Sequence, residues 1–163
     1  MDEYEKDGGA LMSRPNSILI VDDTVANLLA YSAILKKLRC RIVLAGSGAE
    51  ALRCTLDENF AVILLDVRMP EMNGFETADR LRKREGSRNT PILFLSAFDA
   101  PPLHVFSKFV GGQMDFLSSP VDADTLMLKV GLYLKSAGAE EATDPSDPKL
   151  QKAGEKEEGG LPV

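Results

Sequence analysis

Residues 61–76 read AVILLDVRMPEMNGFE, and this stretch decides the fold class of the chain. It begins with five apolar residues that show no in–out alternation, which is typical of a strand buried on both faces of a sheet. An acidic turn begins at Asp66, and residues 74–85 then predict a helix that ends in the basic run RLRKRE. A buried strand followed by a turn and a helix is the repeating unit of parallel α/β proteins.

The same unit recurs on both sides of this stretch. Short apolar runs predict strands at residues 17–21, 40–45, 61–65, 91–95 and 114–117. Amphipathic stretches predict helices at residues 25–38, 48–58, 74–85 and 122–135, with one further helix after Ser96. The predicted apolar stripe of the first helix consists of Leu28, Leu29, Ala33, Ile34, Leu35 and Leu38. This alternation of strands and helices implies a parallel sheet that is covered by helices on both sides.

The composition fits one folded unit with acidic ends. The chain has 163 residues, of which 44% are hydrophobic and 27% are charged, and its net charge is −6. The acidity lies in the ends, because residues 16–136 hold fourteen acids and fourteen bases and are neutral. We therefore predict a disordered leader at residues 1–15, a folded domain at 16–136 and a disordered acidic tail at 137–163.

The sequence also excludes several classes of protein. It has no run of 18 uncharged apolar residues that could span a membrane, and its acidic start is unlike a secretory signal. Two cysteines, Cys40 and Cys54, fit a reduced compartment and cannot make a disulfide framework or a four-ligand zinc site. The basic run at residues 80–84 predicts a solvated helix end, since the domain is neutral overall. We expect a cytoplasmic protein that binds neither membranes nor nucleic acids.

Acidic and hydroxyl side chains follow the predicted strands at one edge of the sheet. Asp22 and Asp23 come directly after the first strand, and Asp66 comes after the third. Ser96 follows the fourth strand, and Ser119 lies just after the fifth. Ligands of open parallel sheets bind outside the carboxyl ends of the strands. The sequence therefore predicts that three carboxylates converge where a ligand would bind.

Each of these carboxylates also has a structural interpretation. Asp22 and Asp23 precede a helix, where Asp is a favoured N-cap, and Asp66 opens a turn. Together, however, three neighbouring carboxylates raise one another's pKa, and a fold tolerates this when a hard cation neutralises them. Mg²⁺ binds through one or two carboxylates with waters and phosphate oxygens, and a carboxylate beside it can attack phosphorus. The group as a whole therefore favours a metal-dependent phosphoacceptor.

Residues 16–136 resemble the receiver domain of two-component response regulators. The resemblance rests on the segments ILIVDDT (18–24), ILLDVRMPEMNGFE (63–76), LFLSA (93–97) and DFLSSPVD (115–122). The most specific of these surrounds Asp66, with Met69, Pro70 and Gly74 at the family's spacing. Residues 104–117 look most like receivers that belong to, or work beside, hybrid sensor histidine kinases. The resemblance implies a flavodoxin-like, doubly wound sheet of five parallel strands in the order 2-1-3-4-5, with helices on both faces.

The resemblance also implies the chemistry of the site. Asp66 is the expected nucleophile, which takes a phosphoryl group from the phosphohistidine of a sensor histidine kinase or a phosphotransfer protein. The expected metal is Mg²⁺ or Mn²⁺. Its implied ligands are Asp23, Asp66 and the backbone carbonyl of Arg68, while Asp22 holds the waters of the metal.

Two further residues are implied to form the switch. The Ser96 hydroxyl is expected to bond a phosphoryl oxygen, and the Phe116 ring is expected to move inward as that hydroxyl shifts. The face built from the helix after Ser96, the fifth strand and the last helix then changes. We expect this face to bind a downstream protein target, which the sequence does not identify, or a second copy of the chain as a homodimer.

One position departs from the family pattern. Receivers carry a lysine immediately before the proline that follows the fifth strand, usually with a cis peptide bond, and here that position is Ser119. Without this cation the carboxylates repel more strongly, so the demand for Mg²⁺ rises. A charge-assisted bond to the phosphoryl group becomes at best a neutral one, which is about half as strong. We expect phosphorylation of Asp66 to survive and its coupling to the switch to weaken.

Three classes of function remain open. The first is a phosphorylation-controlled receiver that acts by binding partners. The second is a pseudo-receiver, a docking module that ignores phosphate; Ser119 favours it, whereas Asp66, Ser96 and the acidic pair oppose it. The third is an aspartate-dependent phosphatase, which needs a second Asp two positions after its nucleophile. Because position 68 is Arg, we do not expect a turnover enzyme.

Overall fold

The structure is a computed structural model that describes residues 16–97 and 113–139. Its strands are β1 (Ser17–Val21), β2 (Arg41–Ala45), β3 (Val62–Asp66), β4 (Ile92–Ser96) and β5 (Met114–Ser118). Its helices are α1 (Val25–Leu35), the 3-10 turn η2 (Lys36–Leu38), α2 (Gly48–Asp57), α3 (Gly74–Arg82) and α5 (Ala123–Ala139). The helix predicted after Ser96, the predicted leader and residues 140–163 of the predicted tail lie outside the described residues.

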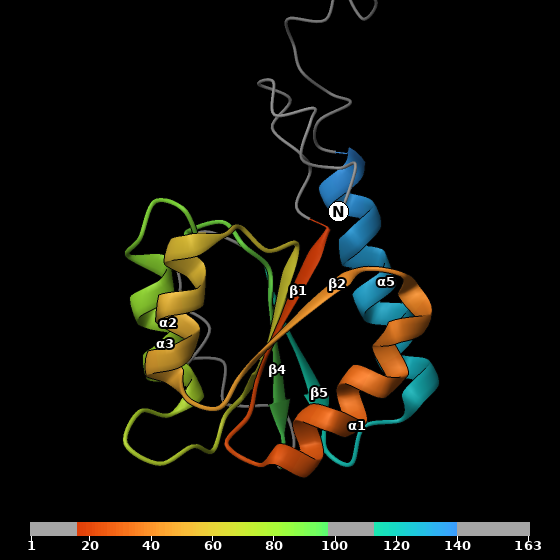
Figure 1. Ribbon diagram of the computed structural model, residues 1–163, viewed down its shortest axis with the longest axis horizontal. Helices are drawn as coiled ribbons and strands as arrows, with labels where there is room; N and C mark the ends of the chain where they lie inside the picture. The colour runs from red at the N-terminus through yellow and green to blue at the C-terminus, as the bar shows by residue number, and fades with distance from the viewer. Residues whose placement is uncertain (1–15, 98–112, 140–163) are drawn as a thin grey trace, which may run out of the picture.

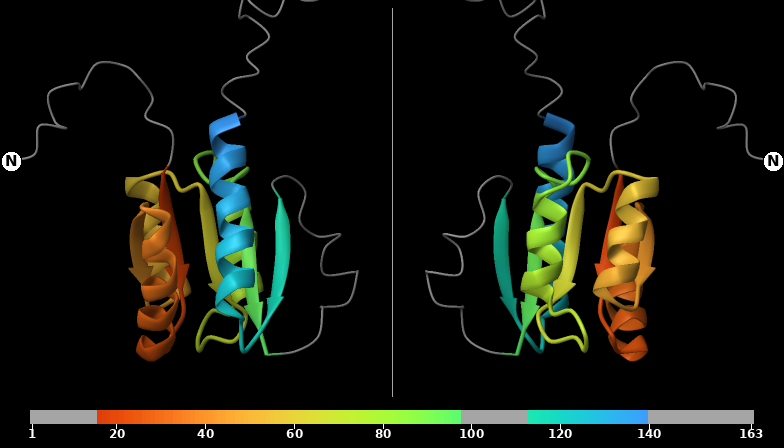
Figure 2. Two further views of the ribbon diagram at one scale, coloured as in Figure 1. Left: turned by 90° about the vertical axis from the view of Figure 1, so that its right-hand side faces the viewer. Right: turned by 90° about the vertical axis from the view of Figure 1, so that its left-hand side faces the viewer.

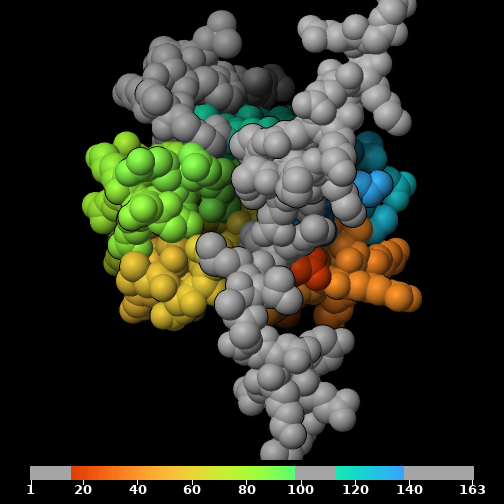
Figure 3. All heavy atoms as spheres, turned by 90° about the horizontal axis from the view of Figure 1, so that it is seen from above, coloured from red at the N-terminus to blue at the C-terminus, as the bar shows by residue number. Residues whose placement is uncertain are grey.

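The five strands form one parallel sheet in the order β2-β1-β3-β4-β5. This result confirms the predicted fold class and strand order. Helices α2 and α3 cover one face, and α1 and α5 cover the other (Figure 1). Seen from above, the yellow and green residues of the first pair lie opposite the orange and blue residues of the second (Figure 3). The strand arrows point to the lower edge in Figures 1 and 2, so the carboxyl ends of the strands lie together there.

Two apolar layers hold the helices on the sheet. The layer under α2 and α3 includes Leu65 and Phe94, and the layer under α1 and α5 includes Leu64 and Leu117. Every residue of β1 and β4 is buried, which explains why their sequences lack alternation. Because the sheet is packed on both faces, polar side chains gather at the two ends of the strands, which we call the amino-terminal edge and the carboxyl edge of the sheet.

Helix α1 differs from its prediction in length and in the face that it buries. It ends at Leu35, and the 3-10 turn η2 replaces the predicted last turn. Its buried residues are Leu28, Tyr31 and Leu35, whereas Leu29 of the predicted stripe is 59% exposed. Successive helical residues point about 100° apart, so Leu28 and Leu29 cannot both face the core centrally. Tyr31, which the prediction omits, occupies the middle of the buried face.

Arg82 is predicted to belong to a solvated helix end, but the structure buries it. Its side chain is 7% exposed and donates hydrogen bonds to the backbone carbonyls of Ser87 at 3.2 Å, Thr90 at 2.6 Å and Gln113 at 3.2 Å. Burial lowers the pKa of this guanidinium. Arg82 therefore ties the end of α3 to the loop before β4 and to the residue before β5.

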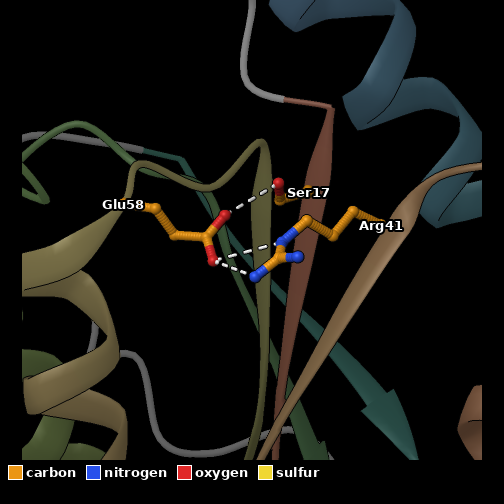
Figure 4. Close-up of polar contacts among 3 residues, drawn as sticks. All are labelled: Ser17, Arg41 and Glu58. Atoms are coloured by element: carbon orange, nitrogen blue, oxygen red, sulfur yellow. Dashed lines mark hydrogen bonds and ion pairs between the residues drawn. The ribbon is translucent and has the colours of Figure 1, made fainter. Parts of the chain in front are cut away.

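Charged side chains at the amino-terminal edge of the sheet are paired (Figure 4). Glu58, the C-cap of α2, accepts a hydrogen bond from the Ser17 hydroxyl at 3.1 Å. Its other oxygen accepts from Nε and Nη2 of Arg41 at 3.3 and 3.1 Å. Ser17 and Arg41 begin β1 and β2, so this carboxylate links the end of α2 to two neighbouring strands.

Helix α5 is longer than the sequence predicts. It continues to Ala139, past the predicted end of the helix at Lys135 and of the domain at residue 136. Within residues 16–97 and 113–139, no helix is both long enough and apolar enough to cross a membrane. Leu128 and Leu132 of α5 are exposed, one helical turn apart.

Candidate functional site

Asp22 directly follows β1 and is only 2% exposed. Its carboxylate accepts a hydrogen bond from the Thr24 backbone N–H at 2.8 Å and another from the Asn27 amide at 3.1 Å. Burial raises the pKa of Asp22, and these two hydrogen bonds oppose that shift. The side chain is therefore held by the first turn of α1.

Asp66 ends β3, and the turn after it requires a glycine at position 74. A Cβ added at Gly74 would lie 2.3 Å from the Asp66 carbonyl oxygen, so only glycine permits this approach. The Gly74 N–H donates to the Val67 carbonyl at 2.9 Å. A capping box between Asn73 and Glu76 then starts α3. The turn thus returns the chain directly against the backbone of Asp66.

The structure brings the three predicted carboxylates together. Oxygens of Asp22, Asp23 and Asp66 lie within 4.8 Å of one another, with Asp23 exposed and Asp66 half-buried. Burial, the Asp22 charge and the Asp23 charge raise the pKa of Asp66 to about 6. The Arg68 backbone N–H, 3.3 Å from Oδ1 of Asp66, opposes this shift. The cluster is therefore electrostatically strained when it holds no cation.

This donor set fits a hard divalent cation. It offers only oxygen atoms, it is partly open to solvent, and its three carboxylates lie close enough to repel one another. A bound cation would relieve the repulsion that raises the pKa of Asp66. The backbone of Arg68 lies beside Asp66, as the hydrogen bond from its N–H requires. The contribution of its carbonyl to metal binding stays a prediction.

Hydroxyl side chains end the two strands beyond β3. Ser96 is the last residue of β4 and is 8% exposed, and Ser118 ends β5 in register with it. The Ser119 N–H donates to the Ser96 carbonyl at 2.6 Å. The Ser119–Pro120 peptide bond is cis, as the resemblance implies. The lysine position of the family is thus tied through its backbone to the end of β4.

Phe116 lies on the face of the sheet that carries α2 and α3. Its ring stacks on Phe94, with ring centres 4.9 Å apart and planes at 22°. Phe75, the residue after Gly74, approaches both rings at 5.2 Å from Phe94 and 6.3 Å from Phe116. The predicted switch aromatic therefore belongs to a cluster of three rings.

Sequence reasoning missed two residues of α1 in this region, Asn27, whose amide donates to Asp22, and Tyr31. Burial raises the pKa of the Tyr31 hydroxyl, and the charges of Asp22 and Asp66 raise it further, so this hydroxyl lies near two of the three clustered carboxylates. The available signal was a tyrosine three residues after Leu28, on the helix face that packs on the sheet. A buried tyrosine hydroxyl usually has a polar partner, so its presence on that face points to a polar neighbour.

A comparison with protein families identifies the class of the chain. The family model described as the response regulator receiver domain matches residues 18–131. The chain therefore belongs to the receiver domain family of response regulators, which are signalling modules of two-component systems.

Individual relatives differ in how much of their own length matches this chain. Protein PilH of Pseudomonas aeruginosa is 30% identical over 117 residues, which are 72% of this chain and 96% of PilH. The transcriptional regulatory protein ZraR of Klebsiella oxytoca is 30% identical over 134 residues, and the sensor histidine kinase GacS of Pseudomonas protegens is 30% identical over 141 residues. These stretches cover 82% of this chain in both cases but only 30% of ZraR and 15% of GacS.

Solved structures show the same architecture. The chemotaxis protein CheY4 of Vibrio cholerae matches with a TM-score of 0.66 and 30% identity, covering 73% of this chain and 98% of CheY4. The receiver domain of a sensor histidine kinase from Pseudomonas aeruginosa matches with a TM-score of 0.65 and 25% identity, covering 74% of this chain and 98% of that domain. That structure has a magnesium ion coordinated in its active site cleft. Receiver domains interact with histidine kinases or phosphotransfer proteins.

Proposed function

We propose that this chain is a phosphoacceptor receiver in which Asp66 takes a phosphoryl group from a phosphohistidine. The observation that supports this most is the cluster of Asp22, Asp23 and Asp66 within 4.8 Å, at the carboxyl edge of a receiver fold. A carboxylate oxygen of Asp66 attacks phosphorus, and the bond from phosphorus to the imidazole nitrogen breaks. The products are an acyl phosphate on Asp66 and a free histidine on the donor.

The cluster supports this reaction in two ways. With its pKa raised to about 6, Asp66 is largely ionised at neutral pH and can act as a nucleophile. Asp22, Asp23 and Asp66, with the backbone carbonyl of Arg68, would hold Mg²⁺ or Mn²⁺. When bound, the cation supplies positive charge to the oxygens of the transferring phosphoryl group. Asp22 is already fixed by its hydrogen bonds from α1, so it presents its charge without reorganising.

The surface beside the cluster suits a protein phosphodonor. Val25 and Leu29 lie on the first turns of α1, directly after the acidic pair, and both are exposed. Exposed apolar side chains beside a reactive group favour docking of a partner protein. We infer that a histidine kinase or a phosphotransfer protein binds here, in the cytoplasm, where the two free cysteines would stay reduced.

We infer that phosphorylation of Asp66 changes a second surface of the domain, at β5 and α5. Ser96 would bond a phosphoryl oxygen, and Phe116 would adjust its stacking in the ring cluster. The face that includes β5 and α5 would then bind a downstream protein or a second copy of the chain. Its exposed Leu128 and Leu132 provide apolar contact area on α5.

Labelling with radioactive acetyl phosphate, or with a phosphorylated histidine kinase or phosphotransfer protein, tests the proposal. We expect Mg²⁺-dependent label on the wild type and none on Asp66→Asn, because an amide oxygen is a poor nucleophile. Asp115→Asn is the matched control, since Asp115 is a carboxylate of β5 paired with Lys129 at 2.6 Å. Wild-type levels of label on Asp66→Asn, or no label on the wild type from either kind of donor, would overturn the proposal.

The pseudo-receiver remains a second candidate because a neutral serine occupies the lysine position. In that case a partner would bind the wild type and Asp66→Asn equally, with or without beryllofluoride, a phosphoryl mimic. A phosphate-dependent receiver would bind its partner differently when the mimic is present. Pull-down of one partner under these conditions separates the two candidates.

A further inference from the structure

The first turn of α3 touches the backbone of Asp66 at one residue and carries an aromatic ring at the next. A Cβ at Gly74 would lie 2.3 Å from the Asp66 carbonyl oxygen and 2.9 Å from the Val67 Cα, so the two segments are in direct contact. The Gly74 N–H donates to the Val67 carbonyl at 2.9 Å. The next residue is Phe75, whose ring is half-buried in the apolar layer under α2 and α3. The backbone that carries this ring is therefore packed on that of the nucleophile.

The turn that carries Phe75 is held by its own hydrogen bonds. The Asn73 side chain accepts from the Glu76 N–H at 2.9 Å, and the Glu76 carboxylate accepts from the Asn73 N–H at 2.9 Å. Reciprocal bonds of this kind fix the start of a helix. A displacement of the Asp66 backbone would therefore be passed to Phe75 and not be absorbed within the turn.

Phe75 lies beside one ring of β4 and one ring of β5. Its ring centre is 5.2 Å from that of Phe94 and 6.3 Å from that of Phe116, with the planes tilted by 43° and 40°. Phe94 and Phe116 stack on each other with their ring centres 4.9 Å apart. All three separations fall within the range of about 4.5–7 Å in which aromatic rings attract. Because Phe94 is fully buried and protein interiors are close-packed, a shift of one ring requires its neighbours to adjust.

We propose that Phe75 is a positioning residue that couples phosphorylation of Asp66 to the position of the Phe116 ring. When the phosphoryl group and the cation bind, Asp66 and the turn packed on it adjust together, Phe75 moves against the two stacked rings, and the stack rearranges. This coupling acts through shape and needs no charged side chain. It therefore suits a chain with a neutral serine at the lysine position of the family. Because Phe116 is the expected switch aromatic, the inference rests on the proposed function.

Nuclear magnetic resonance of the full-length protein tests the inference through the ring signals of Phe116. Mg²⁺ and saturating beryllofluoride are added to the wild type and to Phe75→Leu, which keeps an apolar side chain but loses the ring. We expect the Phe116 signals to shift in the wild type, and to shift by about half as much or less in Phe75→Leu. The fluorine signal of bound beryllofluoride verifies saturation, so a loss of affinity is not mistaken for a loss of coupling.

Phe60→Leu is the matched control. Phe60 is 3% exposed and belongs to the same apolar layer, but it precedes β3 at the amino-terminal edge of the sheet. Both substitutions remove a ring from this layer, so both should lower the thermal stability. Only Phe75→Leu should weaken the response of Phe116, because only Phe75 adjoins the turn that packs on Asp66.

A purely structural Phe75 would give a different result. The response of Phe116 would then be undiminished in Phe75→Leu, or equally diminished in Phe60→Leu, and either outcome overturns the inference. A wild type that binds beryllofluoride without any shift of Phe116 also overturns it. A wild type that does not bind beryllofluoride overturns the proposed function together with the inference, so the two failures are distinguishable.

A titration of the wild type avoids any dependence on variant folding. As beryllofluoride is added in Mg²⁺, we expect the ring signals of Phe75 and Phe116 to shift together, with the same midpoint. Phe75 signals that stay in place while those of Phe116 shift contradict the inference.

Discussion

The two edges of the sheet differ in how their negative charges are balanced. At the amino-terminal edge, Glu58 meets Arg41 and the Ser17 hydroxyl, so its negative charge is paired. At the carboxyl edge, three carboxylates lie within 4.8 Å of one another, and a serine stands at the family's lysine position. The first arrangement ties a helix to two strands. The second leaves repulsion that a cation can relieve, and this difference separates the structural edge from the functional one.

The largest effect should come from adding a fixed cation to the carboxyl edge. In Ser119→Lys, an ammonium group replaces a neutral hydroxyl, and charge-assisted hydrogen bonds are about twice as strong as neutral ones. We expect beryllofluoride to bind about tenfold more tightly in Mg²⁺, which corresponds to about 1.4 kcal/mol. Isothermal titration calorimetry measures this affinity.

Ser118→Lys is the control for this change, because it adds the same charge at the neighbouring exposed residue. It should change the affinity much less. Equal affinities of the wild type and Ser119→Lys for beryllofluoride would show that the residue at position 119 does not affect binding of the phosphoryl mimic.

A smaller effect should appear in the pH dependence of stability without metal. Because the pKa of Asp66 is raised to about 6 in the fold, the folded chain binds this proton more tightly than the unfolded chain does. The resulting stability is full below about pH 4 and is lost as the pH rises through about 6. Asp66→Asn should therefore be more stable than the wild type at pH 7 by about 1 kcal/mol, a value reduced by solvent screening of the half-exposed carboxylate.

Urea unfolding at pH 4 and pH 7, in EDTA and in Mg²⁺, measures this difference. The gain of Asp66→Asn should be much smaller at pH 4, where the folded state is protonated and the unfolded state is about half protonated. It should also shrink in Mg²⁺, which stabilises the wild type by binding it. A gain of equal size at both pH values would mean that charge repulsion at the carboxyl edge is not its cause.

The smallest effect should come from the amino-terminal edge. Glu58→Gln removes an ion pair in which the Arg41 side chain is 69% exposed, and such pairs contribute about 0.2–1 kcal/mol. We expect a loss of about 0.5 kcal/mol in urea unfolding and unchanged phosphorylation of Asp66. Asp79→Asn, which breaks the exposed pair with Lys83, is a comparable control. A changed Mg²⁺ affinity in Glu58→Gln would show that the two edges are coupled.

The fold and the carboxylate cluster could be predicted because their signals are local in the sequence. A strand buried on both faces reads as an unbroken apolar run, and each acidic residue directly follows its strand. Parallel strands bring those ends to one edge, so Asp22, Asp23 and Asp66 meet without any knowledge of side-chain packing. The strand order came from the family resemblance, since the pattern of apolar runs does not determine it.

Tyr31 and Arg82 could not be predicted because their environments come from distant segments. The sequence allowed Leu29 on the buried face of α1, and only packing against β5 and α5 places Tyr31 there instead. Arg82 reads as a solvated cation, but its acceptors are carbonyls of residues 87, 90 and 113, which tertiary structure brings around it. Both residues are buried polar groups, whose partners are not visible in local patterns.

The close approach of Gly74 to Asp66 has a mechanical consequence. With no room for a Cβ between them, the first turn of α3 packs directly on the backbone of the nucleophile. Phe75 belongs to that turn, and its ring lies beside the stack of Phe94 and Phe116, with ring centres 5.2 and 6.3 Å away. An aromatic linkage thus runs from Asp66 to β5 on the α3 side of the sheet. A chain with serine in place of the usual lysine still has this linkage intact.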